Sequence, residues 1–264
     1  MMLFASVLVY LALGACAGVL AGLFGIGGGL VIVPVLIISF GFQGISEGVA
    51  THLAVGTSLA TIIFTSLSSM RSHHVKKAVR WDLFRPMLVG ILAGAAIGAW
   101  TASLMAGESL QALIGVFVIL VAVRMLLDRP PKPGRATPGA VGLGVAGAGI
   151  GWASAIFGIG GGTLTVPYLS WCNVPMPSAI GTAAACGLPI AVAGALANVV
   201  VGWQAEALPA YSLGFVYLPA LLGIVMTSVI CARFGAELAH RLEVRLLKRF
   251  FAVFLLVVGV RFLI

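Results

Sequence analysis

Two glycine-rich runs could bind a ligand through the backbone, because glycine lets a ligand approach closely and lets successive N–H groups form an anion-binding nest. They are residues 25–29 and 158–162, both reading Gly-Ile-Gly-Gly-Gly. Each run interrupts an apolar stretch and precedes a short apolar segment. A helix that begins there presents unpaired N–H groups and the positive end of its dipole. The pattern predicts a site for a small anion, bound by dipoles rather than by full charges.

Hydroxyl groups stand close to both runs and could complete the coordination of an anion. No Lys or Arg lies near the middle of any apolar stretch, so a buried cation is not the expected partner. His52 is a titratable side chain inside the predicted span 48–69, and intramembrane ionisable residues are functional candidates. It could bind substrate or a proton, or instead lie near the interface after Ser46 and Glu47. The residues expected to contact substrate are Gly25, Gly27, Gly28, Gly29, His52, Thr57, Ser58, Gly158, Gly160, Gly161, Gly162, Thr163 and Thr182.

These residues could also have other roles. Glycine runs also let helices pack closely, but two copies, each followed by a short segment with a proline, favour a site. A dinucleotide-binding loop needs G-x-G-x-x-G between a strand and a soluble helix, and that context is missing. No His, Cys, Asp and Glu cluster has metal-ligand spacing, and the four cysteines form no CxxC. The sequence therefore predicts neither an enzyme nor a bound metal or other cofactor.

Composition decides the class of protein that must position these residues. Of 264 residues, 61% are apolar and 8% are charged, whereas soluble domains carry about 25% charged residues. The chain is therefore predicted to be an all-α, polytopic membrane protein whose partner is the lipid bilayer. The net charge of +8 does not indicate nucleic-acid binding, because the basic residues lie in short loops between apolar stretches.

The chain contains an internal repeat. The glycine runs recur at an offset of 133 residues, and Ala54-Val55-Gly56-Thr57 recurs as Ala179-Ile180-Gly181-Thr182. This divides the chain into a first half at 1–127, a linker at 128–138 and a second half at 139–264. The expected helices are 3–23, 30–40, 48–69, 83–104 and 109–127 in the first half, and 138–156, 163–171, 178–201, 213–234 and 249–264 in the second. The Gly- and Ala-rich faces of 90–99 and 178–197 are expected to line the path of the substrate.

The distribution of basic residues predicts opposite orientations for the two halves. Lys and Arg gather in 71–85, in the linker and in 235–249, whereas 105–109 and 202–212 contain neither. The positive-inside rule makes the basic segments cytoplasmic and the other two external, with both termini external. Equivalent loops then lie on opposite sides, as in the inverted repeats of many transporters. Inversion needs an odd number of crossings, so each glycine-broken pair is expected to form a hairpin beside about three full spans.

The doubled glycine block followed by proline, the Gly-Thr helix and the two closing spans resemble the sulfite exporter TauE/SafE family over about residues 5–264. This family is also called the toluene sulfonate uptake permease family. Its glycine motif maps onto residues 25–29 and 158–162, and its Gly-Thr-Ser block onto 56–58. The second copy keeps Gly181 and Thr182 but has Ala183 in place of Ser. The resemblance implies a bacterial inner-membrane transporter of sulfur-containing anions such as sulfite, sulfonates or sulfoacetate.

The functional expectation is a secondary transporter, an exporter in the leading hypothesis, that binds a small sulfur-containing anion between the glycine breaks. The alternative is a passive channel for a small anion or a neutral solute. A coupling proton and a homodimer are further partners that the sequence leaves open.

Overall fold

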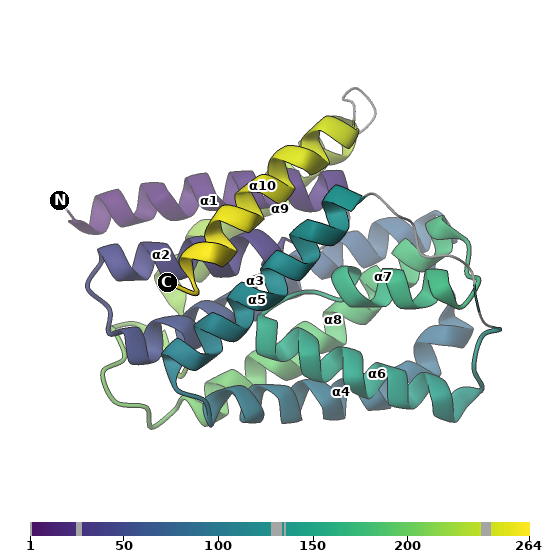
Figure 1. The fold of residues 1–264 in the computed structure, drawn as a ribbon, viewed down its shortest axis with the longest axis horizontal. Helices are drawn as coiled ribbons and strands as arrows, with labels where there is room; N and C mark the ends of the chain where they lie inside the picture. The colour runs from purple at the N-terminus through teal and green to yellow at the C-terminus, as the bar shows by residue number, and fades with distance from the viewer. Residues whose placement is uncertain (1, 25–27, 128–133, 135, 239–243) are drawn as a thin grey trace.

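The computed structural model describes residues 2–24, 28–127, 134, 136–238 and 244–264. Ten helices occupy most of this part of the chain, five in each half (Figure 1). The first half contains α1 (Met2–Phe24), α2 (Gly29–Phe42), α3 (Glu47–Val75), α4 (Trp81–Ser103) and α5 (Gly107–Leu127). The second contains α6 (Ala140–Phe157), α7 (Gly162–Trp171), α8 (Met176–Val201), α9 (Leu218–Leu238) and α10 (Val244–Arg261).

The long helices have the length and composition of membrane spans. Within the described residues, α3, α4, α5, α6 and α8 are each apolar enough and long enough to cross a bilayer. About 20 apolar residues suffice for one crossing, and helices satisfy their own backbone hydrogen bonds in lipid. The predicted all-α, polytopic membrane protein is confirmed.

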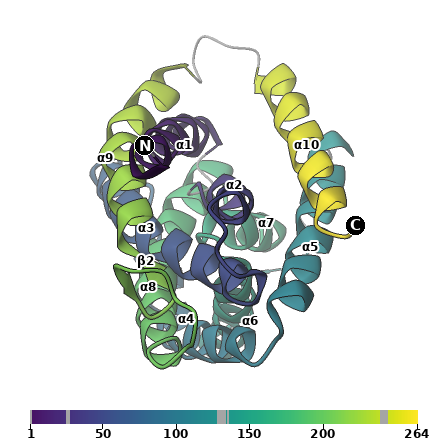
Figure 2. The same ribbon diagram turned by 90° about the vertical axis from the view of Figure 1, so that its left-hand side faces the viewer.

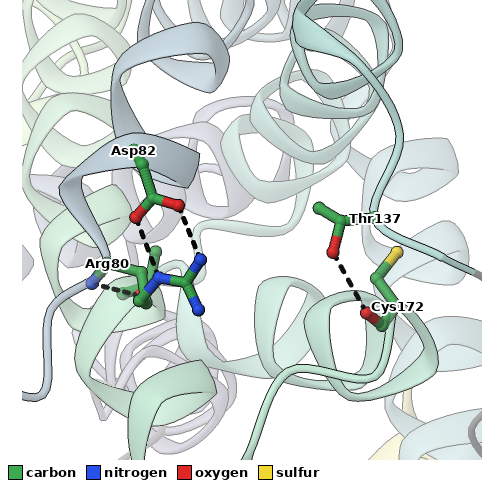
Figure 3. A network of polar contacts seen from close by, with 5 residues as sticks. Arg80, Asp82, Thr137 and Cys172 are labelled. Atoms are coloured by element: carbon green, nitrogen blue, oxygen red, sulfur yellow. Dashed lines mark hydrogen bonds and ion pairs between the residues drawn. The ribbon is translucent and has the colours of Figure 1, made fainter.

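The helix ends gather at two opposite faces of the molecule. At one face, which we call the Glu47 face, a Cβ on Gly107 would lie 2.5 Å from the Glu47 carbonyl oxygen, so α3 and α5 begin side by side. At the other, the linker face, the Arg80 N–H before α4 donates to Thr182 Oγ1 near the start of α8. The linker reaches this same face, because Thr137 Oγ1 donates to the Cys172 carbonyl at 3.4 Å (Figure 3).

Each glycine-broken pair of helices folds back on itself. In the second half, the Gly134 N–H, six residues before α6, donates to the carbonyl of Trp171, the last residue of α7, at 3.2 Å. In the first half, the Tyr10 hydroxyl in α1 hydrogen bonds with Gln43 just after α2, at 2.9 Å. These contacts give each pair the form of the predicted hairpin. Figure 2 shows α2 and α7 between the α1–α9 pair and the α5–α10 pair.

The packing between the two halves is reciprocal. The first helix of each half packs in parallel on the fourth helix of the other, α1 on α9 and α6 on α4. The third helices pack antiparallel, because Leu59 contacts Gly194 and Ser66 contacts Gly187. The fifth helices, α5 and α10, also pack antiparallel. Exchanging the halves therefore reproduces the same set of helix pairs.

Small residues allow the parallel helices of the two halves to pack closely. A Cβ on Gly90, Gly94 or Gly98 of α4 would overlap a backbone carbonyl of α6. This four-residue spacing of glycines is the small-residue motif of membrane helix packing. The 90–99 face was expected to line the substrate path, but these three glycines instead join the two halves.

One predicted helix boundary is wrong. Residues 213–217 were expected to open a helix, but Ser212–Leu213 (β1) and Val216–Tyr217 (β2) form an antiparallel two-stranded hairpin, and α9 begins only at Leu218. Gly214 has φ +53°, a left-handed conformation, and a Cβ there would overlap the Val199 carbonyl oxygen. The hairpin therefore turns tightly against the end of α8.

Candidate functional site

The two glycine breaks contact each other. Gly28 precedes α2 with φ 75°, a left-handed conformation that favours glycine, and Gly158 ends α6 with φ 63°. A Cβ on Gly29 would lie 2.6 Å from the Gly158 carbonyl oxygen and 2.9 Å from the Ile159 Cα. A side chain at position 29 would therefore separate the breaks, and the bare backbone is what allows them to meet.

The second break also lies against the middle of α8. A Cβ on Gly161 would lie 2.6 Å from the Ala183 carbonyl oxygen and 2.8 Å from the Gly187 nitrogen. Gly160 and Gly162 are buried in the same turn. Gly25 and Gly27 lie outside the described residues. The structure thus brings together Gly29, Gly158 and, through α3, Ser58, and their contact with substrate stays a prediction.

Some hydroxyls near the breaks make hydrogen bonds within the described chain, and others do not. Ser58 Oγ donates to the Gly158 carbonyl at 2.7 Å, which fixes α3 to the second break. Thr163, in the first turn of α7, has a buried Oγ1 with no hydrogen-bond partner among the described residues. Buried polar atoms are normally paired, so this hydroxyl is free to bind a ligand beside the N–H groups of the same turn.

Two buried hydroxyls at the second break were not predicted from the sequence. Ser154 and Thr165 are both fully buried, and in the part of the chain that the structure describes neither hydroxyl has a partner. Ser154 is four residues before Gly158, at a spacing of one helical turn that could have indicated it. Thr165 lies two residues beyond Thr163, so the two side chains leave α7 on different sides.

No fixed cation neutralises this region. The sequence contains no Lys or Arg in residues 1–70 or 136–232, which include α1, α2, α6, α7, α8 and the part of α3 before Arg71. No cluster of His, Cys, Asp and Glu suited to a metal occurs in the described part of the chain. The positive potential at the breaks therefore comes from the starts of α2 and α7, each worth about half an elementary charge.

The repeated Gly-Thr pair has a structural role in both halves. In the first half, the Tyr217 N–H donates to Thr57 Oγ1 at 2.9 Å, and a Cβ on Gly56 would overlap the Phe215 carbonyl oxygen. We call this contact between 56–57 and 215–217 the Glu47-face joint. Glycine allows the two backbones to approach each other, and threonine supplies the hydrogen-bond acceptor.

The second half makes the same contact at the opposite face. The Arg80 N–H donates to Thr182 Oγ1 at 3.0 Å, and a Cβ on Gly181 would lie 2.8 Å from the Ala78 carbonyl oxygen. We call the contact between 181–182 and 78–80 the linker-face joint. In both joints the donor is the residue immediately before the fourth helix of the other half. Figure 3 shows the Arg80 side chain beside Asp82, to which it is bound by an exposed ion pair.

His52 belongs to the Glu47-face joint rather than to the glycine breaks. Its ring is 6% exposed and stacks on Phe215 with centroids 5.0 Å apart. Its Nε2 lies 3.0 Å from the Ala102 carbonyl oxygen. Because a carbonyl only accepts, Nε2 carries the proton, and the buried Nδ1 has no partner among the described residues. Of the other predicted substrate contacts, His52 therefore shares its surroundings with Thr57, through Phe215 and Tyr217.

A cavity of about 1060 Å³ opens at the Glu47 face, between α2 and the α5–α10 pair. Apolar residues of α2, of the end of α10 and of 262–264 line it. Its charged lining residues are Glu47, Glu108 and Arg261. Since α2 begins at the first glycine break, the cavity lies at the opposite end of the helix that starts at the candidate site.

Comparison with known proteins identifies this arrangement. The family described as Sulfite exporter TauE/SafE matches residues 10–262. The chain belongs to the TauE/SafE family. The resemblance noted from the doubled glycine block is thereby confirmed, and the names of the family and its relatives indicate a membrane transporter.

Several relatives extend over the whole TauE/SafE chain. A "Probable membrane transporter protein" of Haemophilus influenzae is 37% identical and covers 98% of each chain. A protein of Methanocaldococcus jannaschii with the same type of name is 26% identical, over 93% of this chain and 91% of its own. "Probable membrane transporter protein YunE" of Bacillus subtilis is 32% identical over 62% of this chain and 67% of its own. No solved structure matches the chain.

Proposed function

We propose that this protein is a secondary transporter that exports a small sulfur-containing oxyanion of the sulfite, sulfonate or sulfoacetate type across a bacterial inner membrane. The anion binds between the two glycine breaks, at the starts of α2 and α7. The observation that carries the proposal is the contact of Gly29, the first residue of α2, with Gly158 and Ile159 in the break that precedes α7.

The chemistry of this point favours a compact oxyanion. Two helix starts supply about one positive charge in total, and first-turn N–H groups are natural donors to anions. Thr163 adds a free hydroxyl, with Ser58 and the two joint threonines as further proposed contacts. Three oxygens on a sulfite or sulfonate head can accept these bonds. A cation would find no carboxylate, because α2 and α7 contain none.

We further propose that the two halves have inverted topology, with both termini external. The antiparallel pairing of the equivalent helices α3 and α8 supports a two-fold axis in the membrane plane. Charge supports the orientation, since Arg71, Lys76, Lys77, Arg80 and Arg85 surround the linker-face end of α3 and the start of α4. The positive-inside rule makes this face cytoplasmic. The linker at 128–138 is then cytoplasmic and separates the two halves.

The Glu47 face then opens to the outside, and its cavity suits release better than capture of an anion. Two carboxylates against one guanidinium give the cavity lining a net negative charge, which lowers the local concentration of anions. This supports export. Both breaks belong to one chain, so a homodimer would carry two complete sites.

Binding and flux measurements test the proposal. Purified protein is titrated with sulfite, thiosulfate, taurine, sulfoacetate, sulfate and chloride, and a sulfur oxyanion is expected to bind best. Flux into proteoliposomes is then compared with and without a pH gradient at matched voltage. A proton-coupled carrier responds to the gradient, whereas a passive channel responds to voltage alone. Preference for ammonium or lysine over every anion would refute the anion site.

A further inference from the structure

The Glu47-face joint contains a buried titratable group that its partner joint lacks. His52 lies beneath the joint, stacked on Phe215. The repeat offset of 125 residues that relates Thr57 to Thr182 relates His52 to Pro177. The two joints therefore share the Gly-Thr pair and the backbone donor, but only the Glu47-face joint has a histidine five residues before the threonine of that pair.

The ring of His52 is connected to the joint through Phe215. The Phe215 carbonyl packs against Gly56, and the Phe215 N–H donates to the Asn198 carbonyl at 3.2 Å. Two residues on, Tyr217 makes the hydrogen bond to Thr57. Any movement of Phe215 away from His52 therefore displaces the segment that closes the joint.

Protonation of His52 would place a cation where the folded chain offers it no acceptor. Among the described residues Nδ1 is buried without a hydrogen-bond partner, and Nε2 already donates to Ala102. Toward the Glu47 face, the charged or titratable groups on the elements packed here are Glu47 of α3, Glu108 of α5 and Tyr217 of β2. The other such groups of α3 and α5 lie at the linker-face ends of these helices and are Arg71, His73, His74 and Arg124. None of them contacts the ring among the described residues. The charged residues of α4 and α9 lie at their linker-face ends, and α8 has none.

We propose that His52 Nδ1 is the proton-binding site of this transporter, and that its protonation favours opening of the Glu47-face joint. A buried cation without a hydrogen-bond acceptor is unfavourable, and opening the joint gives water access to the imidazolium. Proton uptake and opening are then linked, because the proton binds more tightly to the open state. The proton comes from water at the Glu47 face and returns to water when the ring loses it. This inference rests on the proposed transport cycle and assigns the coupling step to one residue.

The two joints supply a matched pair of positions for the test. Val216 lies between Phe215 and Tyr217 and is 4% exposed, and Val79 lies between Ala78 and Arg80 and is 8% exposed. Each is replaced by cysteine in a chain freed of its four native cysteines. The labelling rate of each cysteine by a water-soluble thiol reagent is measured from about pH 8 to about pH 5, where histidine titrates, without any anion present.

The proposal requires a difference between positions and a dependence on His52. Each labelling rate is divided by the rate of the same cysteine in the His52→Gln variant at the same pH, which cancels the titration of the thiol. For Val216→Cys this ratio should rise about fivefold or more as pH falls. Fivefold is the lower end of typical coupling between two sites. Labelling of Val79→Cys should show no such rise. Glutamine keeps a donor toward Ala102 but cannot take up the proton.

Either of two results would overturn the proposal. One is a ratio for Val216→Cys that stays constant across the pH range. The other is an equal rise at Val79→Cys, which would point to a general effect of acid. If His52→Gln does not fold, His52→Asn, which also cannot take up the proton, replaces it in the same ratio. Because no anion is present, failure here leaves the anion-binding proposal to its own measurement.

Discussion

Replacing Thr57 by valine should destabilise the protein by removing the hydrogen bond of the Glu47-face joint. Threonine and valine have nearly the same shape, so the fully buried site gains no cavity. What changes is the Tyr217 N–H, which loses its acceptor at 2.9 Å. Leaving a buried donor unpaired costs about 1–3 kcal/mol.

The equivalent change in the linker-face joint should cost less. The donor to Thr182 is the backbone of Arg80, whose side chain is about half exposed in its ion pair, so water can replace the lost hydroxyl. We expect about 1 kcal/mol or less from Thr182→Val. Thr61 provides the control, because its hydroxyl is also fully buried but donates within α3 to the Ser58 carbonyl at 2.7 Å. Thr61→Val leaves no donor unpaired.

Thermal unfolding in detergent, followed by circular dichroism, measures the three variants against the wild type. One kcal/mol corresponds to about 2–4 °C in Tm for a chain of roughly this size. The expected order of Tm is Thr57→Val lowest, then Thr182→Val, then Thr61→Val close to the wild type. If Thr57→Val has the same Tm as Thr61→Val, the hydrogen bond to Tyr217 contributes nothing to stability and the joint is not a stabilising contact.

Three further predictions concern topology, helix packing and surface charge. Cysteines placed at Tyr211 and Val75, both about three-quarters exposed, should label from the outside and the inside of the cell respectively, and labelling from one side only would contradict the inverted arrangement. Gly94→Ala should lower Tm through a clash with the Ala148 carbonyl, whereas Gly149→Ala, with nothing within 4 Å of the new methyl group, should not; equal Tm values would show that α4 and α6 pack differently. Asp82→Asn should change stability by at most about 1 kcal/mol, because its ion pair with Arg80 is exposed to solvent; a larger loss in the same Tm measurement would mean that the pair is shielded.

The sequence predicted the number and order of the helices because long apolar stretches and glycine breaks are local signals. The ten expected segments correspond to α1–α10, and most boundaries agree within a few residues. The exception, at 212–217, depends on Gly214 packing against the end of α8. No local sequence pattern predicts a contact between segments so close to a helix end, so the apolar segment at 212–217 was expected to be helical.

The candidate site was predicted less completely, for the same reason. The glycine breaks were identified from the repeat, and the structure brings Gly29 and Gly158 together. The Gly-Thr pair was expected to face the substrate, whereas Thr57 and Thr182 accept hydrogen bonds from backbone groups 160 and 102 residues away. Each hydroxyl still carries a proton that it could donate, so their contact with substrate stays a prediction. The internal repeat pointed to the Gly-Thr pair, and only the fold showed which residues the pair contacts.

Calorimetric titration of sulfite into the purified protein tests most directly whether an anion binds between the glycine breaks. Gly29→Ala places a methyl group 2.6 Å from the Gly158 carbonyl oxygen, whereas Gly41→Ala, on the same helix, meets nothing within 4 Å. The wild type and Gly41→Ala should bind sulfite with equal affinity, and Gly29→Ala should bind about tenfold more weakly or worse, a loss of at least about 1.4 kcal/mol. A folded Gly29→Ala variant that binds sulfite as tightly as the wild type would contradict the account, because the anion would then bind away from the contact between the two breaks.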